Sequence, residues 1–166
     1  EMLKKLQPYC LMMPSGSGWA EAAKEIHGKF LISMPRYSYS FGSVKSDLLK
    51  EINQQGTFKD DTNRMDLKFV SKLWGVDHFI DLADFDSPED FVTRGIGFYI
   101  EKSGEVIAAA FSSLVCSHSI EVSIFVLDSY RRQGAATVLG SKLLQWCLDN
   151  GMEAHWDAAN RESCKL

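Results

Sequence analysis

The stretch from His118 to Gly140 constrains the fold more than any other part of this 166-residue chain. β-branched and aromatic residues run from Ile120 to Val126 and predict a buried strand. Leu127 to Tyr130 predict a turn, and a helix start rich in small residues follows from Arg131. A strand that leads through a short turn into a helix is typical of α/β domains. The sequence therefore predicts an α/β fold.

The start of this helix has the properties of a phosphate-binding site. A helix N-terminus presents unpaired N–H donors and the positive end of the helix dipole. Gly134 permits close approach of a ligand, and Arg131 and Arg132 add positive charge. The alternative is an exposed basic pair beside a purely structural helix start. We expect phosphate contacts from Arg131, Arg132, Gln133, Gly134, Ala135, Ala136 and Thr137.

From Ser87 onward the sequence predicts a regular succession of elements. Ser87 and Pro88 have the positions of an N-cap and a first helical residue. We expect a short helix at 88–95, a hairpin at 98–115 and the central strand at 120–126. A long amphipathic helix at 132–150 and a further strand at 152–157 follow. Asn160 is expected to cap a final helix. Opposite its apolar face the long helix has a polar stripe of Thr137, Ser141, Gln145 and Asp149.

The first part of the chain predicts a smaller α/β segment. Strands are expected at 9–13, 29–34, 37–41 and 64–67, and helices at 19–26, 44–55 and 73–82. In the helix 44–55, the side chains expected to face inward are Leu48, Leu49 and Ile52. Thr57 to Arg64 is polar and charged, which favours an exposed linker. The predicted domains are therefore an N-terminal α/β segment of residues 1–61 and a core of residues 62–166.

Two motifs resemble those of a known family. Arg131 to Ala136 (Arg-Arg-Gln-Gly-Ala-Ala) resembles the Arg/Gln-x-x-Gly-x-Gly/Ala signature of the GNAT superfamily of acyl-CoA-dependent N-acetyltransferases. With Trp156 to Asn160 (Trp-Asp-Ala-Ala-Asn), the chain is most similar to the zwittermicin-A-resistance type branch. The resemblance extends from about Gly95 to Leu166. It implies a GNAT-like mixed, mostly antiparallel central sheet flanked by helices, with the N-terminal α/β segment added.

The resemblance also implies a coenzyme site. In that family the glycine-containing loop binds the pyrophosphate of coenzyme A, and the strands corresponding to those of Glu121 and Trp156 splay apart around the pantetheine arm. It assigns contacts with this arm to Phe125, Val126, Leu127, Asn160 and Ser163. N-capping is the alternative role of Asn160. Acetyl-CoA is thus the expected co-substrate, and no metal is expected.

Acetyl transfer to an amine needs a neutral amine, a polarised thioester and an acid for the departing thiolate. Glu121 lies near the position at which several family members carry a glutamate base, and we interpret it as the general base. The alternatives are a half-exposed strand carboxylate that attracts a cationic substrate, and an ordered water in place of a base. His118 and His155 are alternative proton carriers. The resemblance places the acid, a tyrosine, just past Leu166, where the last part of the core is also expected.

The sequence therefore predicts an acetyl-CoA-dependent N-acetyltransferase in which an amine attacks the thioester directly. The expected acceptor is a primary amine of a small molecule, and the resistance-type branch suggests an antibiotic-like amine. Two alternatives stay open. One is a non-catalytic acyl-CoA-binding or regulatory domain, and the other is a protein N-acetyltransferase.

Composition limits the partners and the location. The formal net charge of -4 argues against a protein that works mainly by binding nucleic acid or anionic lipid. The four cysteines are scattered without a Cys-x-x-Cys pair, which favours reduced thiols in a cytoplasmic protein and argues against structural zinc. No apolar run approaches the ~20 residues of a membrane span. A monomer or a homodimer is expected.

Overall fold

The computed structural model describes residues 16–34, 36–39, 45–75, 80, 82 and 84–165. The chain divides into two compact units, residues 1–35 and 36–166. This division by contacts does not coincide with the boundary after residue 61 that the sequence suggests, and that boundary stays a prediction. The expected strand at 9–13 lies outside the described residues.

The first unit contains α1 (Ser17–His27) and the 3₁₀ helix η2 (Gly28–Phe30). The helix expected at 19–26 is confirmed, and Gly28 follows it as the C-cap at φ 49°. The strand expected at 29–34 is wrong, because η2 and irregular backbone occupy these residues. Phe30 and Ile32 are 80% and 79% exposed. An apolar run becomes a stable strand only where a partner strand or a core receives it.

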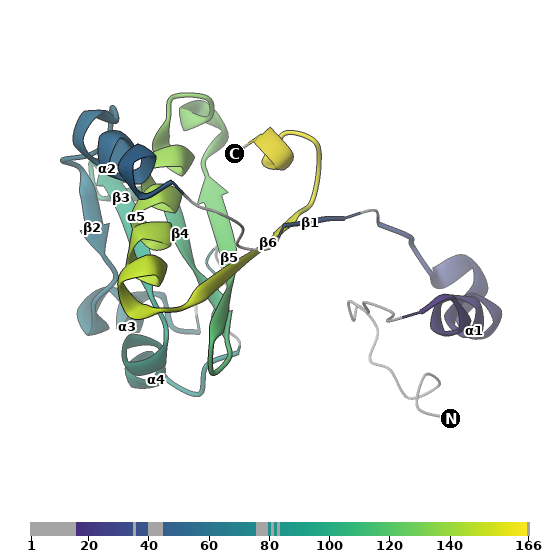
Figure 1. Cartoon of the computed structure of the whole chain (residues 1–166). Helices are drawn as coiled ribbons and strands as arrows, with labels where there is room; N and C mark the ends of the chain where they lie inside the picture. Colours follow the sequence, from purple (N-terminus) through teal and green to yellow (C-terminus); the bar gives the residue numbers. More distant parts are fainter. Residues whose placement is uncertain are drawn as a thin grey trace. The chain divides into compact units, whose positions relative to one another are not determined.

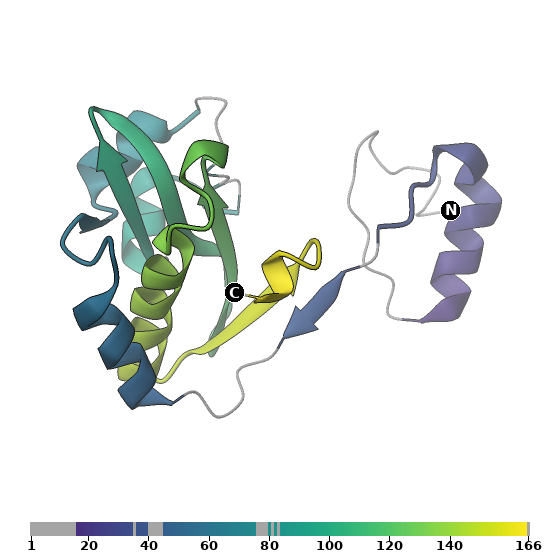
Figure 2. The same ribbon diagram turned by 90° about the horizontal axis from the view of Figure 1, so that it is seen from above.

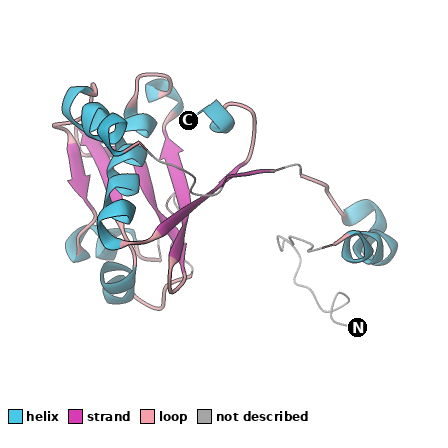
Figure 3. Cartoon of the chain, in the orientation of Figure 1, coloured by secondary structure: helices cyan, strands magenta, loops and turns pink. Residues whose placement is uncertain are grey.

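The second unit is built on a six-stranded sheet with the order β1-β6-β5-β4-β3-β2 (Figure 3). The strands are β1 (Tyr37–Tyr39), β2 (Thr62–Arg64), β3 (Gly97–Lys102), β4 (Glu105–Val115), β5 (Ser119–Val126) and β6 (Glu153–Ala158). Only β5 and β6 pair in parallel, and every other neighbouring pair is antiparallel. The predicted mixed, mostly antiparallel sheet is confirmed, as are the hairpin, the central strand and the strand after the long helix.

Helices cover both faces of this sheet (Figure 1). The helices of the unit are α2 (Ser46–Gln55), α3 (Leu67–Leu73), α4 (Pro88–Arg94) and α5 (Ala135–Asn150), with the 3₁₀ helices η3 (Asp128–Tyr130) and η4 (Ser163–Lys165). α5 lies along one face with α2 beside it, as the view from above also shows (Figure 2). α3 and α4 contribute to a separate core on the other face.

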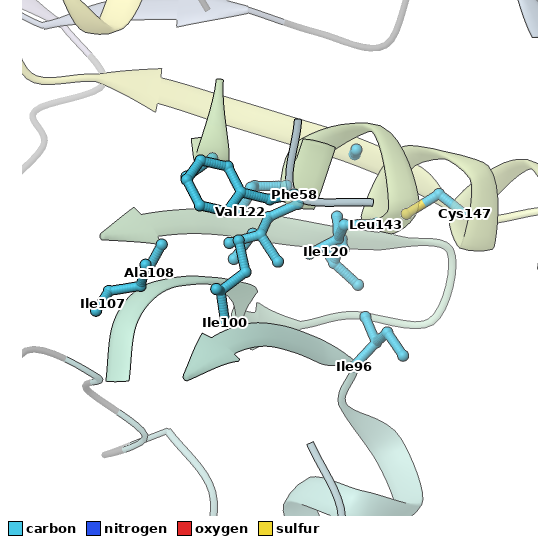
Figure 4. Close-up of a cluster of buried hydrophobic side chains, with 13 residues drawn as sticks. Phe58, Ile96, Ile100, Ile107, Ala108, Ile120, Val122, Leu143 and Cys147 are labelled. Atoms are coloured by element: carbon cyan, nitrogen blue, oxygen red, sulfur yellow. The ribbon is translucent and has the colours of Figure 1, made fainter. Parts of the chain in front are cut away.

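The two cores show how the strands alternate between these faces. On the α5 side, Ile120 and Val122 of β5 share a cluster with Leu143 and Cys147 of α5 (Figure 4). On the other side, Phe111 of β4 joins a second cluster, whose aromatic members include Phe69, Phe85 and Phe91. Successive side chains of a strand point to opposite faces, and β4 supplies both clusters, with Ala108 and Ala110 in the first and Ala109 and Phe111 in the second.

Two helices of the first half differ from the sequence prediction, α3 in its range and α2 in the side chains that it buries. α3 ends at Leu73, where the helix expected at 73–82 was to begin, and the Asp66 carboxylate caps its start by accepting a hydrogen bond from the Phe69 amide at 2.7 Å. Of the expected helix, residues 74 and 75 form a turn, and residues 76–79 and 81 lie outside the described part. In α2, Leu49 is buried as expected, whereas Leu48 is 51% exposed and does not face inward. The strand expected at 64–67 lies slightly earlier, as β2.

The strand expected at 37–41 is present as β1, with residues 40 and 41 outside the described part. Its residues are all exposed. This exposure follows from the position of β1 at the edge of the sheet, beyond β6.

The polar stripe of α5 is not entirely a solvent face. Ser141 is buried, and its hydroxyl donates to Asn53 Oδ1 of α2 at 2.7 Å or to the Val138 carbonyl at 2.8 Å. Gly56, the residue after α2, lies close against α5. A Cβ at this position would collide with the Val138 side chain. α2 therefore packs directly on the stripe, which hydrophobic periodicity alone does not predict.

Candidate active site

The candidate site begins where β5 and β6 separate. Their parallel register runs from Ser119↔Glu153 to Val122↔Trp156 and ends there. β5 continues to Val126 in register with β4, whereas β6 continues to Ala158 in register with β1. Figure 1 shows β6 leaving the direction of β5 beyond this point. The splay that the family resemblance implied is therefore present in the strand pairing.

β5 leads through η3 into a tight loop before α5. Arg132 has a φ of 59° and Gly134 a φ of 92°, so two of the four residues before the helix adopt the left-handed conformation. The sequence predicted a helix start at residue 132. The left-handed conformation of Arg132 and Gly134 prevents this, and α5 starts at Ala135. Gly134 takes up the geometry at no steric cost, because glycine lacks a Cβ.

The N-terminus of α5 offers donors to a ligand. Its N-cap is Gly134, no side chain caps it, and its first turn contains no acidic residue. The first intrahelical bond, from the Val138 amide to the Gly134 carbonyl, leaves the earlier amides of the turn outside the helix ladder. Near Gly134, the Thr57 hydroxyl lies 4.0 Å from the position that a Cβ would take. These residues fit a phosphate group, which needs N–H donors, positive potential and little steric bulk.

Side chains of the loop hold its shape. The Arg131 guanidinium pairs with Asp128 at 2.9 Å and donates to the Val126 carbonyl at 3.4 Å. Gln133 Nε2 donates to the Ser129 carbonyl at 2.9 Å. Arg132 is exposed and makes no ion pair within the described residues. Of the two arginines, Arg132 is thus the one whose charge is left for a ligand.

The residues assigned to the coenzyme arm lie at the ends of β5 and β6. Phe125 and Val126 belong to β5, opposite Ala109 and Ala108 of β4, and the Leu127 amide donates to the Ile107 carbonyl.

On the opposite side of the splay, η4 follows β6. Asn160 Oδ1 accepts from the Ser163 amide at 2.9 Å, so the capping role predicted for Asn160 is confirmed, although the element is a short 3₁₀ helix. The Trp156 indole donates to the Ser163 carbonyl at 3.4 Å, which ties η4 to the point of separation.

Glu121 lies on β5 one residue before the last parallel pair, opposite His155 of β6. Its carboxyl group is half-buried, and removal from water raises its pKa above the ordinary value. The negative charge of Asp157 raises the pKa further, whereas His155, the Asp157 backbone amide and Arg36 lower it. A carboxyl group with a raised pKa is a stronger base toward an ammonium group once it is ionised. Sequence and structure thus place a candidate base beside the splay.

Sequence reasoning missed the groups that surround Glu121. Arg36 Nε donates to Asp157 Oδ2 at 2.9 Å, and its terminal nitrogen donates to the Asp157 carbonyl at 2.9 Å. The two residues are 121 positions apart, so no local pattern connects them. Asp157 was visible only as part of the Trp-Asp-Ala-Ala-Asn motif. His118 comes directly before β5, and the structure gives it no contact with Glu121 among the described residues.

Two kinds of feature are absent from the described residues. No group of three or more His, Cys, Asp or Glu side chains is arranged to hold a metal ion in that part of the chain. Its helices are also too short or too polar to cross a membrane.

Comparison with known proteins agrees with this geometry. A family model for GNAT acetyltransferases matches residues 1–166. An uncharacterized N-acetyltransferase of Bacillus subtilis (strain 168), YdfB, is 26% identical over 73 residues, which cover 44% of this chain and 28% of that protein.

Solved structures share the fold. A GCN5-related N-acetyltransferase-like protein from Streptococcus suis 89/1591 superposes with a TM-score of 0.72 at 21% identity, over 90% of this chain and 61% of that chain. A GNAT-family protein from Novosphingobium aromaticivorans DSM 12444 gives a TM-score of 0.53 at 12% identity, over 80% of this chain and 55% of that one. The chain thus spans less than two thirds of the length of each of these relatives.

Proposed function

The chain belongs to the GNAT acetyltransferase family, and we propose that it transfers an acetyl group from acetyl-CoA to a primary amine of a small molecule. The proposal rests on where α5 begins. Its N-terminus has no side-chain cap, and it follows β5, the strand that separates from β6 beyond the pair Val122↔Trp156. The helix N-terminus is a site for the pyrophosphate of acetyl-CoA, and the separated strands leave room for its pantetheine arm. The two features are neighbours along the chain, as the two parts of the coenzyme require.

In this proposal the loop 131–137 holds the pyrophosphate of the coenzyme. Backbone amides at the start of α5 donate to its oxygens, and Arg132 adds positive charge. Arg131 and Gln133 keep the loop in shape through Asp128 and Ser129. The pantetheine arm runs along Phe125, Val126 and Leu127, with Asn160 and Ser163 on the β6 side. Acetyl-CoA supplies the activated acyl group.

Glu121 acts as the general base in this proposal. Its carboxylate accepts a proton from the ammonium form of the acceptor, directly or through a water molecule, and the neutral amine then attacks the thioester carbonyl. The proposal rests on its position one residue before the last β5–β6 pair and on its half-buried environment, which raises its pKa. The proton acceptor would then lie near the start of β5 and the coenzyme arm along its end, on either side of the last β5–β6 pair.

A direct assay tests this function. The purified chain is incubated with acetyl-CoA and a panel of primary amines that includes polyamines, amino sugars and a lysine peptide, and thiol release and acetylated product are measured. Acetylation of small amines with release of one thiol per product supports the proposal. Acetylation of the peptide alone favours a protein N-acetyltransferase. Coenzyme binding without turnover on any amine favours a non-catalytic acyl-CoA-binding domain.

The finer expectations from the sequence stay part of this proposal. They are the zwittermicin-A-resistance type branch, an antibiotic-like acceptor, a cytoplasmic location and a monomer or homodimer. An amine screen that includes aminopolyol antibiotics addresses the first two.

A further inference from the structure

The inference concerns how Glu121 is set up for proton transfer, and it rests on the proposed function. Glu121 lies opposite His155 in the parallel register of β5 and β6. Asp157 is two residues beyond His155 on β6, so its side chain lies on the same face of the sheet. The Asp157 backbone amide donates a hydrogen bond to the Glu121 carboxyl group, and the Asp157 carboxylate acts on it as a second negative charge.

Asp157 is held in place by a residue outside β6. Arg36, directly before β1, binds it twice: Nε to Oδ2 and a terminal nitrogen to the backbone carbonyl, both at 2.9 Å. The Asp157 side chain is 14% exposed, and its other oxygen, Oδ1, is buried without a hydrogen-bond partner within the described residues. One oxygen of this carboxylate is thus paired with Arg36, and the other has no partner in the part of the chain that the structure describes.

A carboxylate whose charge is only partly compensated by its ion pair also acts on other ionisable groups nearby. The Asp157 charge does act on Glu121, since repulsion by Asp157 raises the Glu121 pKa and attraction by Arg36 lowers it. His155 is the remaining titratable neighbour on β6, and its interaction with Glu121 also lowers the Glu121 pKa. On the β4 side, Leu114 pairs with Glu121 and the Ser113 hydroxyl donates to the Glu121 backbone carbonyl, and neither residue titrates.

We propose that Asp157 is a positioning residue for Glu121, and that its ion pair with Arg36 sets how strongly the Asp157 charge acts on the base. β1, the edge strand, carries Arg36 to the site through its antiparallel pairing Tyr37↔Ala158. The strand thus contributes a charge to the base although none of its own residues is buried.

The proposal predicts that removing the Asp157 charge and removing the Arg36 charge shift the Glu121 titration midpoint in opposite directions. Asp157→Asn removes the repulsive charge, so the Glu121 titration moves to lower pH. Arg36→Gln removes the attractive charge and leaves Asp157 unneutralised, so the titration moves to higher pH. A structural ion pair would lose stability in both variants without moving the titration in opposite directions.

The experiment is a carboxyl ¹³C NMR titration of the full chain, without coenzyme or acceptor. Glu121→Gln identifies the Glu121 signal, and the aspartate signals are followed as well because coupled carboxyl groups titrate as a pair. Arg36→Lys and Asp157→Glu keep each charge and serve as matched controls that retain the wild-type midpoint. Circular dichroism verifies that each variant is folded.

Shifts of opposite sign in Asp157→Asn and Arg36→Gln support the proposal. Unmoved midpoints, or shifts of the same sign, overturn it. If Asp157→Asn does not fold, the comparison of Arg36→Gln with Arg36→Lys decides, since an unmoved midpoint in Arg36→Gln also overturns it. Because the titration needs no coenzyme, its failure is distinct from a failure of acetyl-CoA binding, which would overturn the proposed function instead.

Discussion

Val122 of β5 lies opposite Trp156 of β6, and this is the last pair that the two parallel strands make. On one side of this pair, Glu121 faces His155. On the other side, β5 runs on to the loop before α5, while β6 turns to β1. The candidate base and the candidate phosphate site are therefore both carried by β5, on opposite sides of the point of separation.

Glu121→Gln should lower turnover roughly 100-fold or more, since a positioned general base contributes about 10²–10⁴ to the rate. Glutamine keeps the size of the side chain and removes its proton acceptor. Acetyl-CoA affinity should stay within about twofold of wild type, because Glu121 is not among the residues of the phosphate loop. Steady-state kinetics and calorimetry measure the two effects separately. Unaltered turnover across the pH range would remove the base role.

The raised pKa of Glu121 also predicts a pH dependence of wild-type turnover. The base works when ionised, so kcat/KM should fall as pH decreases through a midpoint above the ordinary glutamate value of about 4.3. The stability effect has the opposite sign. A carboxyl group whose folded pKa is raised binds protons more tightly in the folded state, so its contribution to stability declines as pH rises through this window. Urea unfolding of the wild type and Glu121→Gln over this pH range measures it, and a parallel pH dependence in both proteins would contradict the assignment.

Gly56→Ala should destabilise the fold by about 1–3 kcal/mol, the usual cost of an added methyl group in a filled space. A Cβ at this position collides with the Val138 side chain and lies 2.8 Å from the Ile52 carbonyl. Gly140→Ala is the matched control on α5, because its Cβ would lie 3.6 Å from Ile124, an ordinary contact. It should be neutral or stabilising by up to about 1 kcal/mol. Equal thermal unfolding of Gly56→Ala and the wild type would contradict the packing of α2 on α5.

Asp90 should make stability depend on acid pH. Hydrogen bonds from Arg94, and then from the Asp86 amide, lower the Asp90 pKa to about 2. A depressed pKa stabilises the folded state above the unfolded value of about 3.9, and this contribution is lost as pH falls through about 2. Unfolding of Asp90→Asn should therefore differ from wild type at neutral pH and converge with it in strong acid. Glu89→Gln, in the same helical turn, is the control, and a pH-independent difference for Asp90→Asn would refute this reasoning.

Local patterns predicted the elements whose causes are local. Ser87 caps α4 by accepting from the Asp90 amide, and Gly151 ends α5 at φ 64°, as their residue types indicate. The left-handed conformation of Arg132 was not predictable, because arginine rarely adopts it and the loop imposes it. This conformation is the reason that α5 begins three residues later than its apolar period suggests.

Tertiary contacts explain the remaining differences. Ser141 is polar but buried because α2 reaches it from a distant part of the sequence through Asn53. Phe30 and Ile32 are apolar but exposed, because residues 16–34 include no strand that could pair with them. Arg36 reaches Asp157 only because β1 pairs with β6. A single sequence contains no local signal for these two contacts or for the exposure of Phe30 and Ile32.

The phosphate assignment depends on the loop geometry at Gly134. Gly134→Glu puts a carboxylate where a phosphate should bind, and it should weaken acetyl-CoA binding more than about tenfold, since a lost hydrogen bond to a charged group costs about 1.5–3 kcal/mol. Gly104→Glu is the matched control. Gly104 also has a positive φ, 81°, and lies in the β3–β4 turn with nothing within 4 Å of an added Cβ. Its variant therefore adds the same strain and charge at another site.

Calorimetric titration of acetyl-CoA and acetyl-pantetheine into the wild type, Gly134→Glu and Gly104→Glu tests the central claim most directly. The account predicts that wild type and Gly104→Glu bind acetyl-CoA with similar affinity. It also predicts that Gly134→Glu binds acetyl-CoA more than about tenfold more weakly, and that acetyl-pantetheine, which lacks the pyrophosphate, binds all three proteins weakly. Equal affinity of wild type and Gly134→Glu for acetyl-CoA, or equal affinity of the wild type for the two thioesters, would contradict the assignment of the phosphate site to the start of α5.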